Sequence, residues 1–260
     1  MKKHSLRLAA LFFCAALTGM FASCSKFYGE PTTMNYPVNG NYTKLDVSHA
    51  FDVTVSADVT EAVVTIPEDL HSKLKLEVKD GTLYIGFTRS WIVASGECKV
   101  VLPLNMQLKD LELSGASSFI GNLQGVKSDV EVSGASKFYG DVVAAEVDME
   151  LSGASKFEGG VMCDEVDMDL SGASTATVHG ACTGTMEMEV SGSSDLHAIE
   201  FNTDAVTGSL SGSSDADVTV CSRIAVSVSG SSDLTYGTSS PACHPTFACT
   251  LSGSSTATPR

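Results

Sequence analysis

Acidic side chains recur at fixed distances from a repeated tetrapeptide, and their spacing is the strongest sign of chemistry in this sequence. One set lies two residues before each of the first five copies of the tetrapeptide, and a second set lies four residues before the same copies. The candidate calcium ligands among them are Glu112, Glu131, Glu150, Asp129, Asp148 and Asp167. Calcium accepts several carboxylate oxygens in flexible geometry, so weak calcium binding is one interpretation. The other is a solvated acidic face, because exposed charges about 5 Å apart repel by only about 0.8 kcal/mol in water.

Cysteines supply the second kind of chemistry. Cys163 and Cys182 each follow the first serine of a tetrapeptide by the same number of residues, so stacked repeats would place them at a distance compatible with a disulfide. Export from the cell would permit that bond. Two buried thiols that fill one column of the core are the alternative. Cys243 and Cys249 are further candidates to staple the longest interval between repeats.

Motifs for catalysis or zinc binding are not evident. His179, His197 and His244 lack paired cysteines at the usual zinc spacings. The abundant serines belong to the tetrapeptides, and no nucleophile elbow accompanies them. The near-constant repeat length also leaves little room for the loops that a polysaccharide-cleaving enzyme needs. We therefore expect no catalytic site and no cofactor apart from the calcium alternative.

The tetrapeptide itself, Ser-Gly-Ala/Ser-Ser, occurs eight times. Its copies begin at Ser114, Ser133, Ser152, Ser171, Ser191, Ser211, Ser229 and Ser252. The spacing is close to 19–20 residues except for the last interval, which is longer. A constant period of this length is typical of a solenoid, in which each repeat stacks on its copy.

Residues around each tetrapeptide alternate between apolar and polar, as in a strand with one buried face. The position before each first serine is always aliphatic, from Leu113 to Leu251, and phenylalanine or a smaller apolar residue follows five positions after it. These columns predict an all-β solenoid with about 19–20 residues per coil, whose glycines occupy corners with positive φ. An antiparallel meander of hairpins is the competing architecture.

The amino-terminal segment predicts export. Residues 1–23 have a basic head and a short apolar run, and Phe21-Ala22-Ser23-Cys24 resembles a lipobox, so Cys24 is the expected lipid attachment site. An ordinary signal peptide is the alternative. Residues 24–41 contain Pro and Gly and are expected to form a tether. The domain then spans 42–258, with atypical strands in 42–109 and the tetrapeptide repeats in 110–258.

The charge of the chain excludes one class of partner. Sixteen basic residues face 31 acidic residues, for a net charge of −15. Three of the basic residues lie in the predicted signal peptide, so the mature chain is more acidic still. Such a surface repels phosphate backbones, and nucleic acid is not an expected partner.

Three features together resemble the auto-transporter adhesin head GIN domain family of bacterial envelope proteins, found widely in Bacteroidetes. They are the strand Phe51-Asp52-Val53-Thr54-Val55, the turn and strand from Asp80 to Ile85, and the run of Leu-Ser-Gly-Ala-Ser repeats from Leu113. The resemblance covers roughly 42–258. It implies a right-handed, single-stranded β-helix-like fold and an adhesive or envelope-associated role, and it carries no catalytic residues.

We accordingly expect an adhesin-like binding module, anchored as an outer-membrane lipoprotein and either periplasmic or surface-exposed. Its partner would be an envelope, matrix or host component such as a glycan or protein, besides the membrane that the anchor contacts. A structural scaffold that associates with itself as an oligomer is the main alternative. A carbohydrate-active enzyme is the third hypothesis.

Overall fold

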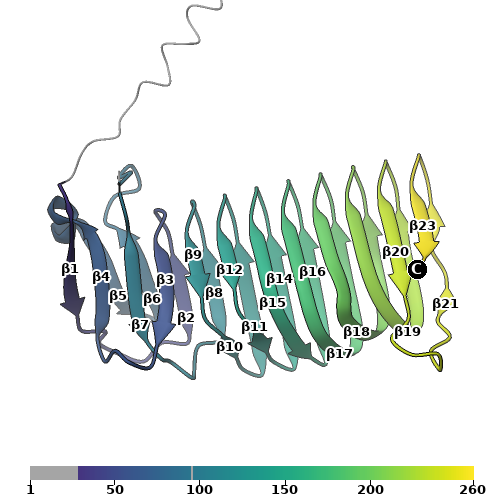
Figure 1. The fold of residues 1–260 in the computed structure, drawn as a ribbon, viewed down its shortest axis with the longest axis horizontal. Coiled ribbons are helices and arrows are strands. Elements are labelled where there is room, and N and C mark those ends of the chain that lie inside the picture. The colour runs from purple at the N-terminus through teal and green to yellow at the C-terminus, as the bar shows by residue number, and fades with distance from the viewer. Residues whose placement is uncertain (1–28, 95) are drawn as a thin grey trace, which may run out of the picture.

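The computed structural model describes residues 29–94 and 96–260 as a rod made of a β-solenoid of about eight turns (Figure 1). Strands account for 59% of the chain and helix for 3%, which confirms the predicted all-β solenoid. The predicted signal peptide and Cys24 lie outside the described residues. Within them, no helix has the length and hydrophobicity needed to cross a membrane.

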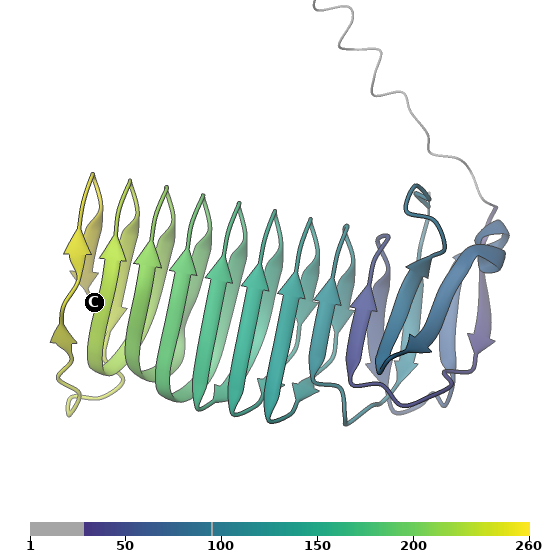
Figure 2. The same cartoon turned by 180° about the vertical axis from the view of Figure 1, so that it is seen from behind.

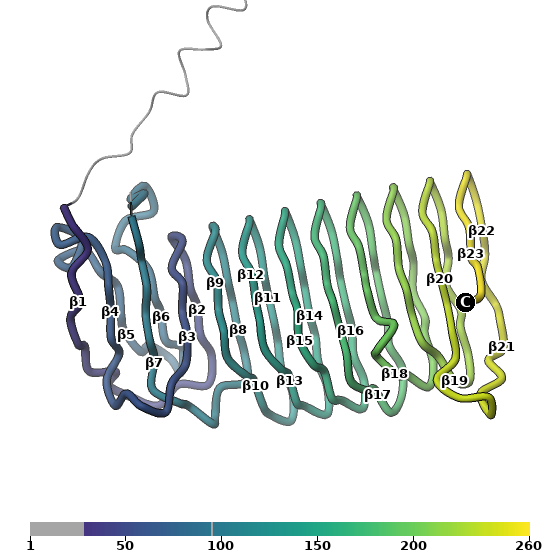
Figure 3. The backbone as a smooth tube through the Cα atoms, in the orientation of Figure 1, coloured from purple at the N-terminus to yellow at the C-terminus, as the bar shows by residue number. Residues whose placement is uncertain are grey.

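Each coil consists of two strand regions joined at the tetrapeptide corner. In one coil, β11 (Lys127–Val132) leads through the corner to β12 (Lys137–Tyr139), and β14 (Glu146–Leu151) begins the next coil. β11 and β14 pair in parallel with Val132 opposite Leu151. Like residues therefore stack on like, and the corners form a row along one edge of the rod (Figure 3).

The corner glycines have the conformation that the repeat predicts. Gly172 has a φ of +79°, and a Cβ built on it would lie 2.5 Å from the carbonyl oxygen of Gly153. Any side chain at this position would thus be strained twice, by the left-handed backbone and by the corner below. Glycine is required because successive corners contact each other through their backbones.

The predicted columns form one continuous core. Phe119, Phe138 and Phe157 are fully buried and stack along the rod, with ring centroids 5.7 and 5.1 Å apart. The aliphatic column is open in the last coil, where Leu251 is 51% exposed. Among the described residues no further coil packs against the last one, so Leu251 is not covered on its outer side.

The remaining strands of the repeats stack along the rod in the same way (Figure 2). Their bounds are β8 (Asp110–Leu113), β9 (Ser118–Ile120), β10 (Leu123–Gln124), β13 (Val142–Val143), β15 (Lys156–Cys163), β16 (Glu165–Leu170), β17 (Thr175–Val190), β18 (Asp195–Leu210), β19 (Asp215–Val228), β20 (Asp233–Gly237), β21 (Thr246–Phe247), β22 (Thr250–Leu251) and β23 (Thr256–Pro259).

The amino-terminal end is built from antiparallel strands. β1 (Pro31–Tyr36) pairs with β4 (Ala62–Pro67), and β5 (Leu74–Lys79) pairs with β6 (Thr82–Phe87) after the 3-10 helix η1 (Glu68–Lys73). Residues 31–36 were expected within the tether, and their place in β1 corrects that boundary. Pro31 begins the strand and Pro37 follows it, and neither interrupts its ladder to β4.

The first coil in the sequence is not the first along the rod. β2 (Lys44–Val47) lies between β6 and β8, while β3 (Asp52–Ser56) lies between β7 (Lys99–Pro103) and β9. Residues 62–103 thus fold back over the coil that precedes them. This arrangement brings β5 and β6 next to the corner that joins β2 to β3.

Candidate functional site

The corner between β2 and β3 carries a histidine where the repeats carry glycine. Val47 pairs with Leu113, so His49 aligns with Gly115 of the next coil. His49 has a φ of +65° and Ala50 a φ of +61°. Non-glycine residues in this region cost about 1–3 kcal/mol and persist only where the surroundings enforce them, often at functional sites.

The His49 side chain is held over β6. Its Nδ1 lies 2.7 Å from the hydroxyl oxygen of Ser48 and accepts a 3.4 Å hydrogen bond from the Phe87 N–H. Gly86 makes room for both side chains, because a Cβ there would lie 2.6 Å from Ser48 Oγ and 2.9 Å from His49 Nδ1. With Nδ1 accepting, the neutral ring carries its proton on Nε2. Among residues 29–94 and 96–260, Nε2 has no hydrogen-bond partner and remains available as a donor.

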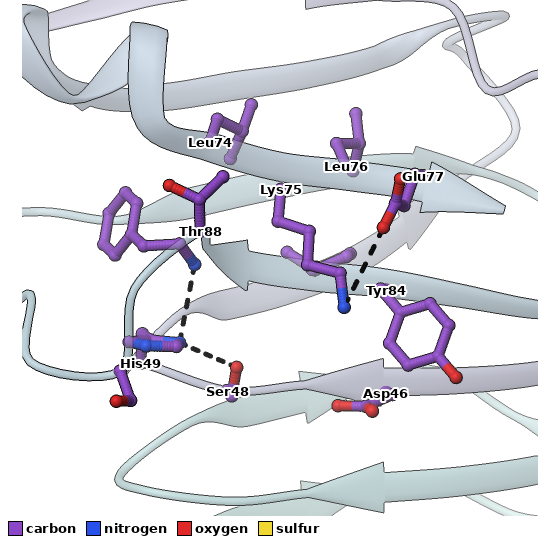
Figure 4. Close-up of a pocket in the computed structure, with 12 residues that line it drawn as sticks. Asp46, Ser48, His49, Leu74, Lys75, Leu76, Glu77, Tyr84 and Thr88 are labelled. Atoms are coloured by element: carbon purple, nitrogen blue, oxygen red, sulfur yellow. Dashed lines mark hydrogen bonds and ion pairs between the residues drawn. The ribbon is translucent and has the colours of Figure 1, made fainter. Parts of the chain in front are cut away.

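Charged and aromatic side chains from three strands complete the site (Figure 4). Tyr84 on β6 stands opposite Asp46 on β2 and Glu77 on β5. Lys75 Nζ lies 3.8 Å from the centroid of the Tyr84 ring and 3.9 Å from Glu77 Oε1. The alternation of these strands sends the four side chains to the outer face, while Ile85 and Phe87 face the core.

Together these residues line an open groove of about 600 Å³, which we call the His49 groove. This volume falls within the range of about 300–1,000 Å³ that is common for small-ligand sites. Burial, followed by repulsion from Glu112, raises the pKa of Asp46, while Lys75 and Lys44 oppose the rise. The groove thus combines carboxylate acceptors with cationic and neutral donors.

The six candidate calcium ligands and Asp169, which we call the acidic ladder, lie on the same face of the rod as the His49 groove, farther from its amino-terminal end. Glu112, Glu131 and Glu150 stand in register, as do Asp129, Asp148 and Asp167. Most of the six border a shallow depression of about 270 Å³ that also includes Asp169. Lys127 Nζ bridges Glu146 Oε1 at 2.7 Å and Asp148 Oδ2 at 2.5 Å. In the described part of the chain, no three His, Cys, Asp or Glu side chains form a group that could hold a metal ion.

Cys163 and Cys182 stand opposite each other between β15 and β17, as the spacing predicts, and both are thiols in the structure. The expected staple between Cys243 and Cys249 is wrong. Cys243 instead bonds to Cys221, with a Cα–Cα distance of 4.6 Å, and Cys249 is a thiol. The long last interval folds back beside β19, which brings Cys243 to the preceding coil rather than to its own end.

Sequence reasoning did not single out the His49 groove. Val47-Ser48-His49-Ala50 has the aliphatic-Ser-x-Ala pattern of the repeats, with His in place of Gly. Residues 62–103 separate this copy from the next one, so it falls outside the constant period. A search for the corner pattern that tolerated another residue at the glycine position would have found it.

The fold and this site define a capped β-solenoid with a groove on one face, near its amino-terminal end. The family described as "Putative auto-transporter adhesin, head GIN domain" matches residues 41–239, and the chain belongs to this family. A comparison with curated proteins found no match.

Solved structures share the fold. A "putative adhesin" from Parabacteroides merdae has a TM-score of 0.78 and 15% identity over 90% of this chain and 98% of its own. A "putative adhesin" from Parabacteroides distasonis has a TM-score of 0.75 and 19% identity, over 89% of this chain and 98% of its own. A "putative lipid binding protein" from the same species has a TM-score of 0.63 and 19% identity, over 89% of this chain and 97% of its own. At these identities the likeness concerns the fold alone.

Proposed function

We propose that this chain is an outer-membrane lipoprotein, attached through Cys24, that acts as a non-catalytic, adhesin-like binding module for neutral saccharides of the envelope or matrix. The observation that carries the proposal is the His49 groove, where a strained histidine replaces the corner glycine. Membership of an adhesin-named family supports an envelope location.

The chemistry of the groove matches a polyhydroxylated, uncharged ligand. Saccharide hydroxyls both donate and accept hydrogen bonds. Asp46 and Glu77 supply acceptors, while Lys75 and the Nε2–H of His49 supply donors. Tyr84 adds an aromatic wall. An anionic sugar would meet the two carboxylates of the groove and the acidic ladder beyond Glu112, so we expect discrimination against it.

A hydrolytic role for Ser48 and His49 is less consistent with the site. Nucleophilic serine needs a base that a third group orients. Across the described residues, no carboxylate is hydrogen-bonded to the His49 ring, and Nδ1 already accepts from the Phe87 N–H. Binding without turnover is therefore the function that this geometry favours.

A glycan array that contains neutral and acidic oligosaccharides, probed with the mature full-length protein, tests the proposal. We expect binding to neutral glycans and about a ten-fold loss of affinity for Tyr84→Ala, as for the removal of one good contact. Tyr139→Ala is the matched control, because Lys156 Nζ also lies over that ring, at 5.7 Å, outside the groove. Selective binding of acidic glycans, or equal affinity of Tyr84→Ala and the parent, would refute it.

A scaffold that associates through its last coil is the second candidate. Phe247 and Leu251 are 48% and 51% exposed there, which leaves part of the core column open. Sedimentation of the protein without glycan distinguishes the two functions. Concentration-dependent oligomers that Leu251→Ser abolishes would favour the scaffold, whereas a monomer that binds glycan favours the module.

A further inference from the structure

The segment 89–94, between β6 and β7, presents two large apolar side chains to solvent. Trp91 is 63% exposed and Val93 is 65% exposed, while Ile92 between them is only 2% exposed. The Ile92 N–H donates to the Arg89 carbonyl oxygen at 3.1 Å, which closes a turn with Trp91 inside it. The buried Ile92 therefore fixes the turn, and its neighbours project outward as a pair.

This turn lies beside the place where the amino-terminal segment joins the domain. Pro31 at the start of β1 pairs with Pro67, and a Cβ built on Gly96 would lie 3.7 Å from the Pro67 ring. The Glu68 N–H also donates to the Glu30 carbonyl oxygen at 3.1 Å. Figure 1 shows β1 at the same end of the rod as β6 and β7, the two strands that the segment 89–94 connects.

The covalent distance from this place to the proposed lipid is short. Four residues lie between Cys24 and Gly29, and the five steps of chain that join the two span at most about 18 Å. An acyl group on Cys24 would thus hold the end of the rod that carries Trp91 at the membrane surface. The tether raises the effective concentration of the turn at the bilayer, so even a weak contact would be populated.

We propose that Trp91 and Val93 dock into the interfacial layer of the membrane that holds the Cys24 lipid. This inference rests on the lipoprotein part of the proposed function. Tryptophan favours the boundary between headgroups and acyl chains. Arg89, whose guanidinium lies 5.7 Å from the Trp91 ring, can contact lipid phosphates from the same turn. The acidic ladder is repelled by anionic headgroups, which favours contact through this end of the rod.

Because Trp91 is the single tryptophan of the chain, its emission reports directly on the contact. The lipidated, full-length mature protein would be reconstituted in phosphatidylcholine vesicles that contain lipid brominated near the glycerol end of the acyl chains. We expect a blue shift and loss of most Trp91 emission. We also expect Val93→Ser to increase transfer between vesicles several-fold, whereas Val126→Ser, in the exposed connection between β10 and β11, leaves transfer unchanged.

Two results would overturn the inference in distinguishable ways. If mass spectrometry shows acylated Cys24 but bromine leaves Trp91 emission unchanged, the docking is wrong and the lipoprotein assignment stands. If Cys24 carries no acyl group, both are wrong, while glycan binding by the His49 groove remains a separate measurement.

Discussion

Cys163 lies directly opposite Cys182 on the neighbouring coil, and both side chains are buried. The hydrogen bond between the pair, together with burial, raises the pKa of Cys163. The same hydrogen bond lowers the pKa of Cys182 to about 7. Cys182 is therefore the thiol of the pair that supplies a thiolate near neutral pH, the form that reacts during oxidation.

We expect mild oxidation of the purified protein to form a Cys163–Cys182 disulfide, faster as the pH rises through about 7. Peptide mapping without reduction measures the bond, and closing a loop of about 19 residues should raise the free energy of unfolding by about 3 kcal/mol. Cys98 is the control, because burial raises its pKa to about 11 and it should remain a thiol. Complete alkylation of Cys163 and Cys182 after oxidation would contradict the prediction.

The acidic ladder should make stability depend on pH and salt. Burial, followed by repulsion from neighbours such as Glu187, raises the pKa of Asp167, and burial followed by Asp167 raises that of Asp169. A carboxyl group with a raised pKa binds protons more tightly in the folded state. The free energy of unfolding therefore falls as the pH rises from the unfolded value near 3.8 through the raised folded value.

Urea unfolding at mildly acidic and at neutral pH measures this effect. We expect a higher midpoint at the acidic pH, a rise with added salt only at neutral pH, and a higher neutral-pH midpoint for Asp167→Asn. Glu61→Gln, a change of an exposed carboxylate outside the ladder, should leave the midpoint unchanged. A midpoint that increases steadily from acidic to neutral pH would show that the repulsion is unimportant.

Two glycine substitutions separate backbone strain from stacking. Gly81 and Gly172 have φ values of +78° and +79°, but a Cβ on Gly81 meets nothing within 4 Å, whereas one on Gly172 lies 2.5 Å from Gly153 O. We expect Gly81→Ala to cost about 1–2 kcal/mol and Gly172→Ala to cost about 1–3 kcal/mol more. Chemical denaturation measures both, and equal costs would mean that corner stacking is adaptable.

The strain at the His49 corner should be separable from its ligand contacts. Ala50→Gly relieves the left-handed backbone next to the groove, so we expect about 1 kcal/mol of added stability and unchanged glycan affinity. His49→Gly relieves similar strain but removes the Nε2 donor, so we expect the affinity to fall about ten-fold without loss of stability. If the glycan affinity of His49→Gly were unchanged, His49 would not contact the ligand.

The repeated part of the fold follows from the sequence because its signals are local and agree with one another. Leu113 and Phe119 sit at fixed offsets from a corner whose glycine needs positive φ, and eight copies repeat that agreement. Burial at the end of the array depends less on local sequence. Leu251 has the pattern of a core residue, yet its burial depends on a covering coil rather than on its own repeat.

The sequence by itself therefore determined the all-β solenoid, its coil length, its buried columns and the alignment of its carboxylates and of Cys163 with Cys182. Only the tertiary structure decided that 62–103 fold back over β2, that Gly86 lies beneath Ser48 and His49, and that Cys243 bonds to Cys221. The physical reason is the range of the contacts. Stacking at a constant period is encoded in each repeat, whereas these contacts join segments whose separation obeys no period and whose register is set only when the cap packs on the core.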